Sequence, residues 1–415
     1  MLLISTNVFP QLQNNEDYYR GVFFKVQAIA SRFTSLWDKD IYGPVLLVDP
    51  KTHKYIANTN PENNVVLFND TIYEGYLPKE MHVYNTIVDW KGKTWAMAML
   101  PLSNIEGHDS HTVIHELAHA TLKNKGFPIE LVDINHVNAV QGKVLIRLEL
   151  EILKKLLNNG DNYQEYLVDA LMVRKLRLET FPNKIEEENK LELNEGLAEY
   201  TALIMHNFTH YERASFYTML IDKFIDNPLY DRRYAYITTP TYGFYLSKKG
   251  SLWTQKLNPS TNLTDFFIKG FGINASPQKL DHYITKYHLE SFKESEIQLA
   301  ENNKRIKDSI AYVFMKQSHL EIDLDKMSFS SKFRNQFYLD DLGKYYKGAK
   351  INDTWGELIV EGGGILLTND FKKAYLTEPK LISNDSVVGN GYKIKFLEGY
   401  RVEKKSNTIY HMTSQ

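Results

Sequence analysis

The sequence predicts an α+β protein with a mixed sheet near the N-terminus, a mainly helical middle and a β-rich C-terminal domain. Three patterns support this class. Short apolar runs between Pro, Gly, Asn and Asp turns fill residues 43–102, helical periodicity follows, and strand-like alternation returns after about residue 313. The expected parts are an N-terminal helical segment, a mixed sheet with one helix, a helical subdomain and a β-rich C-terminal domain, at residues 1–42, 43–130, 131–312 and 313–415.

The elements of the N-terminal part follow from this periodicity. Residues 12–40 carry apolar side chains at helical spacing, which predicts a helix. Strands are expected within residues 44–49, 54–58, 65–69, 82–90 and 93–100. In the last strand, one face would carry Trp95, Met97 and Met99, and the other Ala96, Ala98 and Leu100.

The helix that follows this strand has recognisable ends, because Asp109 or Ser110 can serve as its N-cap and Gly126 as its stop. Further helices are predicted over residues 134–158, 162–180, 185–207, 211–225 and 281–312. Segments such as "HLEIDL" and "GELIVEG" then predict the strands of the C-terminal domain.

The composition excludes several kinds of site. With 49 Lys+Arg against 51 Asp+Glu, the chain lacks the basic excess of a nucleic-acid surface or a polybasic membrane patch. Cysteine is absent, so any metal must be held by His, Asp or Glu. No apolar stretch reaches the ~18 residues of a transmembrane helix. The N-terminal apolar run has four residues, too short for a signal peptide's h-region but compatible with the remnant of one. Localisation, including export, therefore stays open, as does the oligomeric state.

The most specific feature is "HTVIHELAHA" at residues 111–120, which contains H-E-x-x-H. On a helix, His115 and His119 lie one turn apart on one face, so both imidazoles can reach one Zn²⁺ at about 2.0–2.1 Å. Glu116 is turned too far to be a ligand but can contact a water on the metal. Zinc lowers the pKa of that water towards about 7, and a neighbouring carboxylate can pass its proton to a leaving amine. The alternative is an amphipathic helix with two solvated histidines.

A third ligand is available in "LNEGLAEY", which begins at residue 193. Glu195 and Glu199 are four positions apart and face the same way on a predicted helix. One can bind zinc while the other accepts a hydrogen bond from a zinc-bound histidine and fixes its orientation. Two solvated glutamates are the alternative, but the apolar residues around them indicate a packed helix.

Together, these two motifs resemble the gluzincin metallopeptidases, the superfamily that contains thermolysin and the zinc aminopeptidases. The surrounding helices also resemble those of a group of bacterial gluzincin-like proteins. The resemblance implies that His115, His119 and Glu195 bind zinc, that Glu116 is the general base, and that Glu199 orients a ligand histidine. It also implies a zincin-like catalytic unit and a peptide or protein substrate.

Two features depart from most of that superfamily. The gap from His119 to Glu195 is 195 − 119 = 76 positions, so at least two long helices must leave the site and return. The Gly-x-Met-Glu-Asn stretch with which zinc aminopeptidases hold a substrate's N-terminus is missing. In gluzincins the edge strand before the metal helix pairs with an extended peptide, and residues 93–100 would be that strand. Its Trp95 face would line the cleft or, equally, pack in a core.

Other residues are assigned less directly. Gluzincins use a Tyr or His beyond the zinc glutamate to donate to the oxyanion, for which Tyr242 is the first candidate and Tyr236 the second. His111 is expected to be a capping or cleft-lining residue, because a fourth ligand would close the catalytic position. His136 and His210 are expected at the surface.

These observations favour a zinc metallopeptidase. A second hypothesis is a binding or interaction protein that keeps the zinc site, which a closed site of four ligands would favour. Hydrolysis of a non-peptide amide or ester by the same residues is a third.

Overall fold

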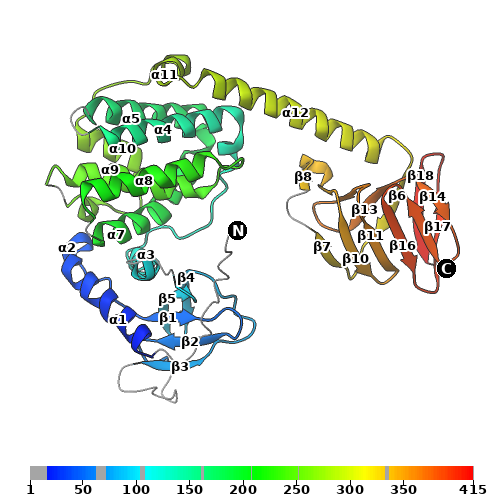
Figure 1. Ribbon diagram of the computed structural model, residues 1–415, viewed down its shortest axis with the longest axis horizontal. Coiled ribbons are helices and arrows are strands. Elements are labelled where there is room, and N and C mark those ends of the chain that lie inside the picture. The colour runs from blue at the N-terminus through cyan, green and yellow to red at the C-terminus, as the bar shows by residue number, and fades with distance from the viewer. Residues whose placement is uncertain are drawn as a thin grey trace, which may run out of the picture. The chain divides into compact units, whose positions relative to one another are not determined.

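The computed structural model describes residues 16–61, 72–102, 108–159, 163–206, 208–250, 252–331 and 336–414. The strand predicted at residues 65–69 lies outside them. The chain forms two compact units, residues 1–293 and 294–415. The predicted α+β class with a β-rich C-terminal region is confirmed (Figure 1).

The sheet of the first unit has the strand order β3-β2-β1-β5-β4. Strands β1 and β5 are parallel and the other pairs are antiparallel, so the sheet is mixed as predicted. Its strands are β1 Val45–Val48, β2 Lys54–Ala57, β3 Tyr73–Tyr76, β4 Thr86–Trp90 and β5 Lys93–Met99. The expectation that residues 93–100 form an edge strand is wrong, because β5 pairs on both sides. Among the described strands, β4 is the edge beside it.

The two faces of β5 belong to different cores. Ala96 and Ala98 join the main core of the unit, beneath the helix that carries H-E-x-x-H, whereas Trp95 and Met97 are buried in a smaller cluster with Leu46 and Tyr55 of neighbouring strands. The Trp95 face therefore packs in a core and does not line a cleft.

Helix α3 (His108–Asn124) carries the H-E-x-x-H motif and packs between β5 and the helices above it (Figure 1). Asp109 accepts hydrogen bonds from the backbone N–H of Ser110 and from Lys25 Nζ, each through Oδ1. After the helix, Gly126 adopts a left-handed conformation with φ of +80°, so the predicted stop is where the chain turns.

Helices α4, α5 and α7–α11 form a layer on the other side of α3 (Figure 1). The hairpin α4–α5 leaves the site and returns, as the 76-position gap predicts, and a π-helical turn at Glu192–Gly196 joins α6 to α7. The α-helices other than α3 are α1 Glu16–Ala30, α2 Thr34–Trp37, α4 Val140–Asn158, α5 Tyr163–Thr180, α6 Ile185–Leu191, α7 Leu197–Met205, α8 His210–Ile225, α9 Ala235–Ser247, α10 Leu263–Phe271, α11 Leu280–Tyr287 and α12 Glu290–Met315. None of the helices in the described ranges is long and apolar enough to cross a membrane.

The second unit contains two sheets. One is antiparallel, with the order β14-β15-β16-β11-β10-β7, and the other is mixed, with the order β17-β18-β6-β13-β12-β9-β8 and a parallel pair β18–β6. Buried residues of both sheets, such as Ile351 and Leu320, share one core, which is the arrangement of a β-sandwich. The strands are β6 His319–Asp323, β7 Ser328–Ser331, β8 Gln336–Tyr338, β9 Lys344–Tyr346, β10 Ala349–Asp353, β11 Gly356–Val360, β12 Ile365–Leu367, β13 Lys373–Thr377, β14 Pro379–Ile382, β15 Ser386–Gly389, β16 Tyr392–Phe396, β17 Tyr400–Lys404 and β18 Ile409–Ser414.

Candidate metal centre

Two histidines of α3 and one glutamate of the π-helical turn converge on a single point. The Nε2 atoms of His115 and His119 are 3.0 Å apart. Glu195 Oε2 is 3.6 Å from the first of these nitrogens and 3.3 Å from the second. All three residues are at most 8% exposed. The two motifs, 76 positions apart in the chain, are therefore brought together as the sequence predicts.

These distances fit a tetrahedral zinc site. Zinc bonds of about 2.0–2.2 Å to nitrogen and oxygen place neighbouring tetrahedral ligands about 3.3–3.5 Å apart. The three observed separations, 3.0, 3.3 and 3.6 Å, bracket that value. An ion equidistant from the three atoms would keep a fourth position open.

The π-helical turn places Glu195 within reach of α3. Such turns widen a helix by one residue and are frequent at functional sites. Close packing against α9 accompanies it, because a Cβ on Gly196 would lie 2.5 Å from Thr239 Oγ1. The glycine after the ligand is therefore required by the approach of two helices.

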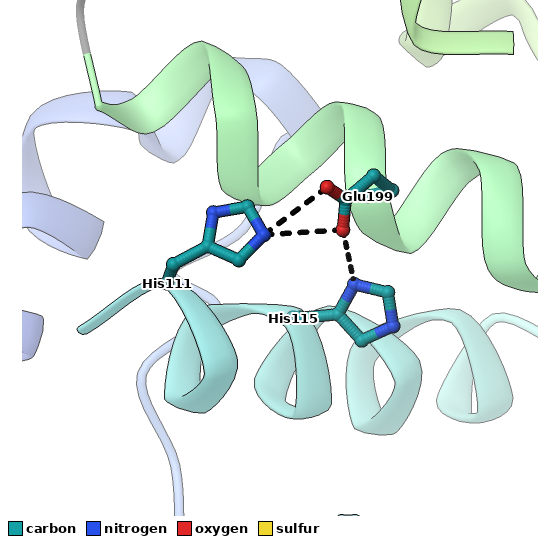
Figure 2. A group of neighbouring side chains, drawn as sticks. All are labelled: His111, His115 and Glu199. Atoms are coloured by element: carbon teal, nitrogen blue, oxygen red, sulfur yellow. Dashed lines mark hydrogen bonds and ion pairs between the residues drawn. The ribbon is translucent and has the colours of Figure 1, made fainter. Parts of the chain in front are cut away.

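Glu199 holds the other side of His115, as predicted. Its Oε2 is 2.9 Å from His115 Nδ1, the nitrogen that faces away from the three-residue site (Figure 2). Glu199 therefore fixes which nitrogen of His115 is presented to a metal. Figure 2 also shows His111 one turn earlier on α3, with its Nε2 at 3.1 Å from both Glu199 oxygens.

His111 thus differs from the expectation of a capping or cleft-lining residue. Its Nε2 contacts Glu199, and the residue does not line the cavity beside Glu195. His111, His115 and Glu199 are also close enough to hold an ion themselves. The group of His115, His119 and Glu195 is the better candidate metal site, because Glu116 and the adjoining cavity lie beside it.

Buried carboxylates change the protonation of His115. Burial by itself lowers the pKa of His115, but its hydrogen bonds to Glu195 and Glu199 raise that pKa to about 10. Burial by itself raises the pKa of Glu195 and of Glu199, and the neighbouring histidines hold both well below the ordinary value. Without a metal ion, His115 is therefore protonated, because the two carboxylates around it favour a positive charge there.

Metal binding at neutral pH is expected to release about one proton for each ion bound, because His115 must lose its proton to become a ligand. Protons are released and not taken up, because the pKa of His115, about 10, keeps its imidazole protonated at pH 7 in the metal-free protein. Titration of the chelator-stripped protein with Zn²⁺ in a weakly buffered indicator solution measures the release. A release near zero at pH 7 would mean that His115 is already neutral.

Glu116 lies beside the ligands without joining them. It is 5% exposed and borders a cavity of about 460 Å³ together with His115, His119 and Glu195. Burial raises the pKa of its carboxyl, while the two histidines oppose this. A buried carboxylate with a raised pKa next to a metal site is suited to proton transfer.

The same cavity has groups that can hold a substrate. Residues 84–87, which lead into and begin edge strand β4, also border it. Asn194 also lines it, and its buried Oδ1 has no hydrogen-bond partner among the described residues. Arg232 reaches the site as well, with Nη1 3.1 Å from Glu195 Oε1.

The expectation for Tyr242 is wrong. Its side chain is fully buried, and its hydroxyl donates to Glu149 Oε1 at 2.9 Å, away from the cavity. Tyr236, the second candidate, lies at the site. Its ring stacks on His115 with centroids 5.4 Å apart, and its hydroxyl donates to Glu195 Oε2.

Of the two histidines expected at the surface, one is exposed and the other is buried. His210 is exposed as expected. His136 is not at the surface, because its side chain is 6% exposed and its Nε2 is 2.7 Å from Glu188 Oε1. Glu188, which also accepts a hydrogen bond from Arg177, holds the His136 ring in the buried contact.

Arg232 and residues 84–87 carry no motif, so periodicity and spacing do not identify them. Asn194 lies within "LNEGLAEY", but the pattern assigns it no role. Comparison with protein-family models, with curated proteins and with solved structures found no match.

Proposed function

We propose that this chain is a zinc-dependent peptidase whose first unit is a zincin-like catalytic unit. The observation that carries the proposal is the combination of three converging ligand atoms with an unligated glutamate beside them. A structural metal site has no use for Glu116, whereas hydrolysis needs a base in that position.

His115, His119 and Glu195 would hold the ion, and zinc would supply Lewis acidity towards the carbonyl and the water. The Glu116 carboxylate would accept the proton of the attacking water and deliver it to the leaving amine. Tyr236 would donate its hydroxyl to the oxygen that gains negative charge. Glu199 would keep His115 in the required tautomer.

The edge strand β4 supports a peptide as the substrate. An unpaired strand edge can add an extended peptide through backbone hydrogen bonds. Asn194 Oδ1, which lacks a partner among the described residues, could accept a further N–H from the bound chain. An ester or a small amide would use the same ligands and base but not the strand edge.

A zinc-containing interaction protein is the second candidate. That hypothesis favours a closed site of four ligands, and His111, the neighbouring histidine on α3, is engaged by Glu199. An open position favours catalysis.

Zinc content tests this proposal first. After dialysis against a weak chelator, the wild-type protein is expected to retain about one zinc, and Glu195→Ala to lose it, because two histidines alone bind zinc weakly. Elemental analysis measures both, with Glu179→Ala on α5 as an exposed control. Retention of zinc by Glu195→Ala would place the third ligand elsewhere. Wild-type protein without metal would remove the basis of the peptidase proposal.

Replacing Tyr236 with Phe is expected to lower kcat by about 10²- to 10³-fold with little change in zinc content, because a donor to the oxyanion is lost. Tyr242→Phe is the matched control, since it removes a hydroxyl six positions along the same helix. Its effect should fall on stability and not on kcat. Equal kcat values for Tyr236→Phe and wild type would exclude the donor role.

A further inference from the structure

A second cavity adjoins the metal centre. Its volume is about 740 Å³, and it shares Arg232 and Tyr236 with the cavity that contains the ligands. Glu199, which holds His115, borders it too. The two cavities therefore adjoin at Arg232 and Tyr236.

Apolar side chains line much of this second cavity. Val132 and Ile134 come from the segment after α3, and Phe216 and Leu220 come from α8. All four are only partly buried and pack on the main core. A large apolar group that enters the cavity would cover them, and removal of that surface from water is favourable.

The rim of the cavity is cationic. Lys223, Arg232 and Arg233 line it, together with the acidic residue Asp231. Arg233 is paired with Asp231 at 2.8 Å. Lys223 is exposed and has no carboxylate partner among the described residues.

Arg232 links this rim to the catalytic site. One nitrogen contacts Glu195, yet half of its side chain is exposed, which leaves donors for a ligand. Since Glu199 is engaged by His111 and His115, Lys223 and Arg232 set the charge that an incoming group meets.

We propose that this second cavity selects the substrate, and that it accepts peptides in which a large apolar side chain beside the scissile bond is followed by a carboxylate. The carboxylate belongs to an Asp or Glu side chain or to the C-terminus of the peptide. The inference rests on the proposed function for the scissile bond, but the cavity and its charge are independent of catalysis. An anion alone would leave the apolar wall unused, and an apolar group alone would leave Lys223 without a partner.

Peptide binding to the Glu116→Gln protein tests the proposal, because this variant is expected to bind without cleaving. Fluorescence anisotropy would compare labelled peptides that differ at two places. One peptide has Phe followed by a free C-terminus, a second has Phe followed by Glu and an amidated end, a third has Phe and only the amide, and a fourth has Ala for Phe. We expect at least tenfold tighter binding when Phe and a carboxylate are both present. The first two peptides distinguish the sources of the carboxylate.

Two variants, made in this Glu116→Gln background, separate the parts of the cavity. Lys223→Glu is expected to remove the preference for a carboxylate, with Lys269→Glu on α10 as an exposed control. Leu220→Trp is expected to fill the cavity and remove the preference for Phe, and Met219→Trp is its control at the adjacent, exposed position. Circular dichroism and zinc content verify that each variant is folded.

The outcomes also separate this inference from the proposed function. If wild-type protein cleaves peptides but binding shows neither preference, or if Lys223→Glu and Leu220→Trp change nothing, the inference is overturned and the peptidase stands. If wild-type protein cleaves none of the peptides while both preferences are present and are lost in the variants, the ligand class is supported and the peptidase falls.

Discussion

Replacing Glu116 with Gln is expected to lower the rate of peptide hydrolysis by about 10²- to 10⁴-fold while zinc stays bound. The side-chain amide keeps the size of the carboxyl but cannot accept a proton from the attacking water. Because Glu116 contributes no ligand atom to the group formed by His115, His119 and Glu195, metal affinity should be nearly unchanged.

The decisive measurements are kcat on a cleaved peptide and zinc content on the same preparation. Glu179→Gln, an exposed carboxyl on α5, is the matched control and should behave as wild type. Full activity of Glu116→Gln would require another base, and loss of zinc together with activity would make Glu116 a ligand.

Replacing Arg174 with Met is expected to destabilise the first unit by about 3–5 kcal/mol, because it leaves buried carboxylates without their partner. Arg174 is 1% exposed. It donates to Glu149 at 2.8 Å and, through two nitrogens, to Glu192 at 2.6 and 2.7 Å. Glu149 also contacts Arg177, so the loss extends through a buried network.

Urea unfolding followed by tryptophan fluorescence measures this change on metal-free protein. Four of the five tryptophans belong to the first unit, and Trp355 alone belongs to the second, so the signal reports mainly the relevant unit. Lys190→Met on α6, which breaks an exposed pair with Glu186, is the control and should shift the midpoint little. A change for Arg174→Met no larger than for this control would mean that the arginine contributes nothing to stability.

The residues of the candidate metal site could be predicted from the sequence because each belongs to a local pattern. The spacing of His115 and His119 is one helical turn, and the four positions from Glu195 to Glu199 are another. Both patterns survive folding because the segments that carry them are helical. The long gap between them could be read only as helices that must return, which the hairpin α4–α5 does.

The sequence does not show which side of helix α9 faces the candidate site, so it could not decide between Tyr236 and Tyr242. Six positions along a helix rotate a side chain by about 240°, so the two tyrosines point in very different directions. Helix α9 is buried on almost every side, and its apolar residues therefore give no periodicity from which to choose. Only the packing of α9 on the π-helical turn decides between them.

The edge of the sheet was missed for a related reason. Strands 82–90 and 93–100 were both predicted, but β5 gains its second partner from β1, whose paired residues lie 96 − 45 = 51 positions earlier. Pairing between distant strands follows from topology and not from local alternation. The buried network of Arg174 and Arg177 likewise lies in helices whose charges resemble those of a solvated surface.

The π-helical turn at Glu192–Gly196 lies in a helix that contacts two separate groups of side chains. Upstream of the ligand, Glu192 meets the buried arginines, and downstream, Glu199 meets the histidines. A π-helical turn holds one residue more than an α-helical turn, so deleting one residue within it would give ordinary α-helix and largely keep the phase of its two ends. The contacts of Glu192 and Glu199 could then both be kept, whereas Glu195, inside the turn, would point in a different direction. Such a deletion would thus remove the candidate metal site although its three candidate ligand residues are still present.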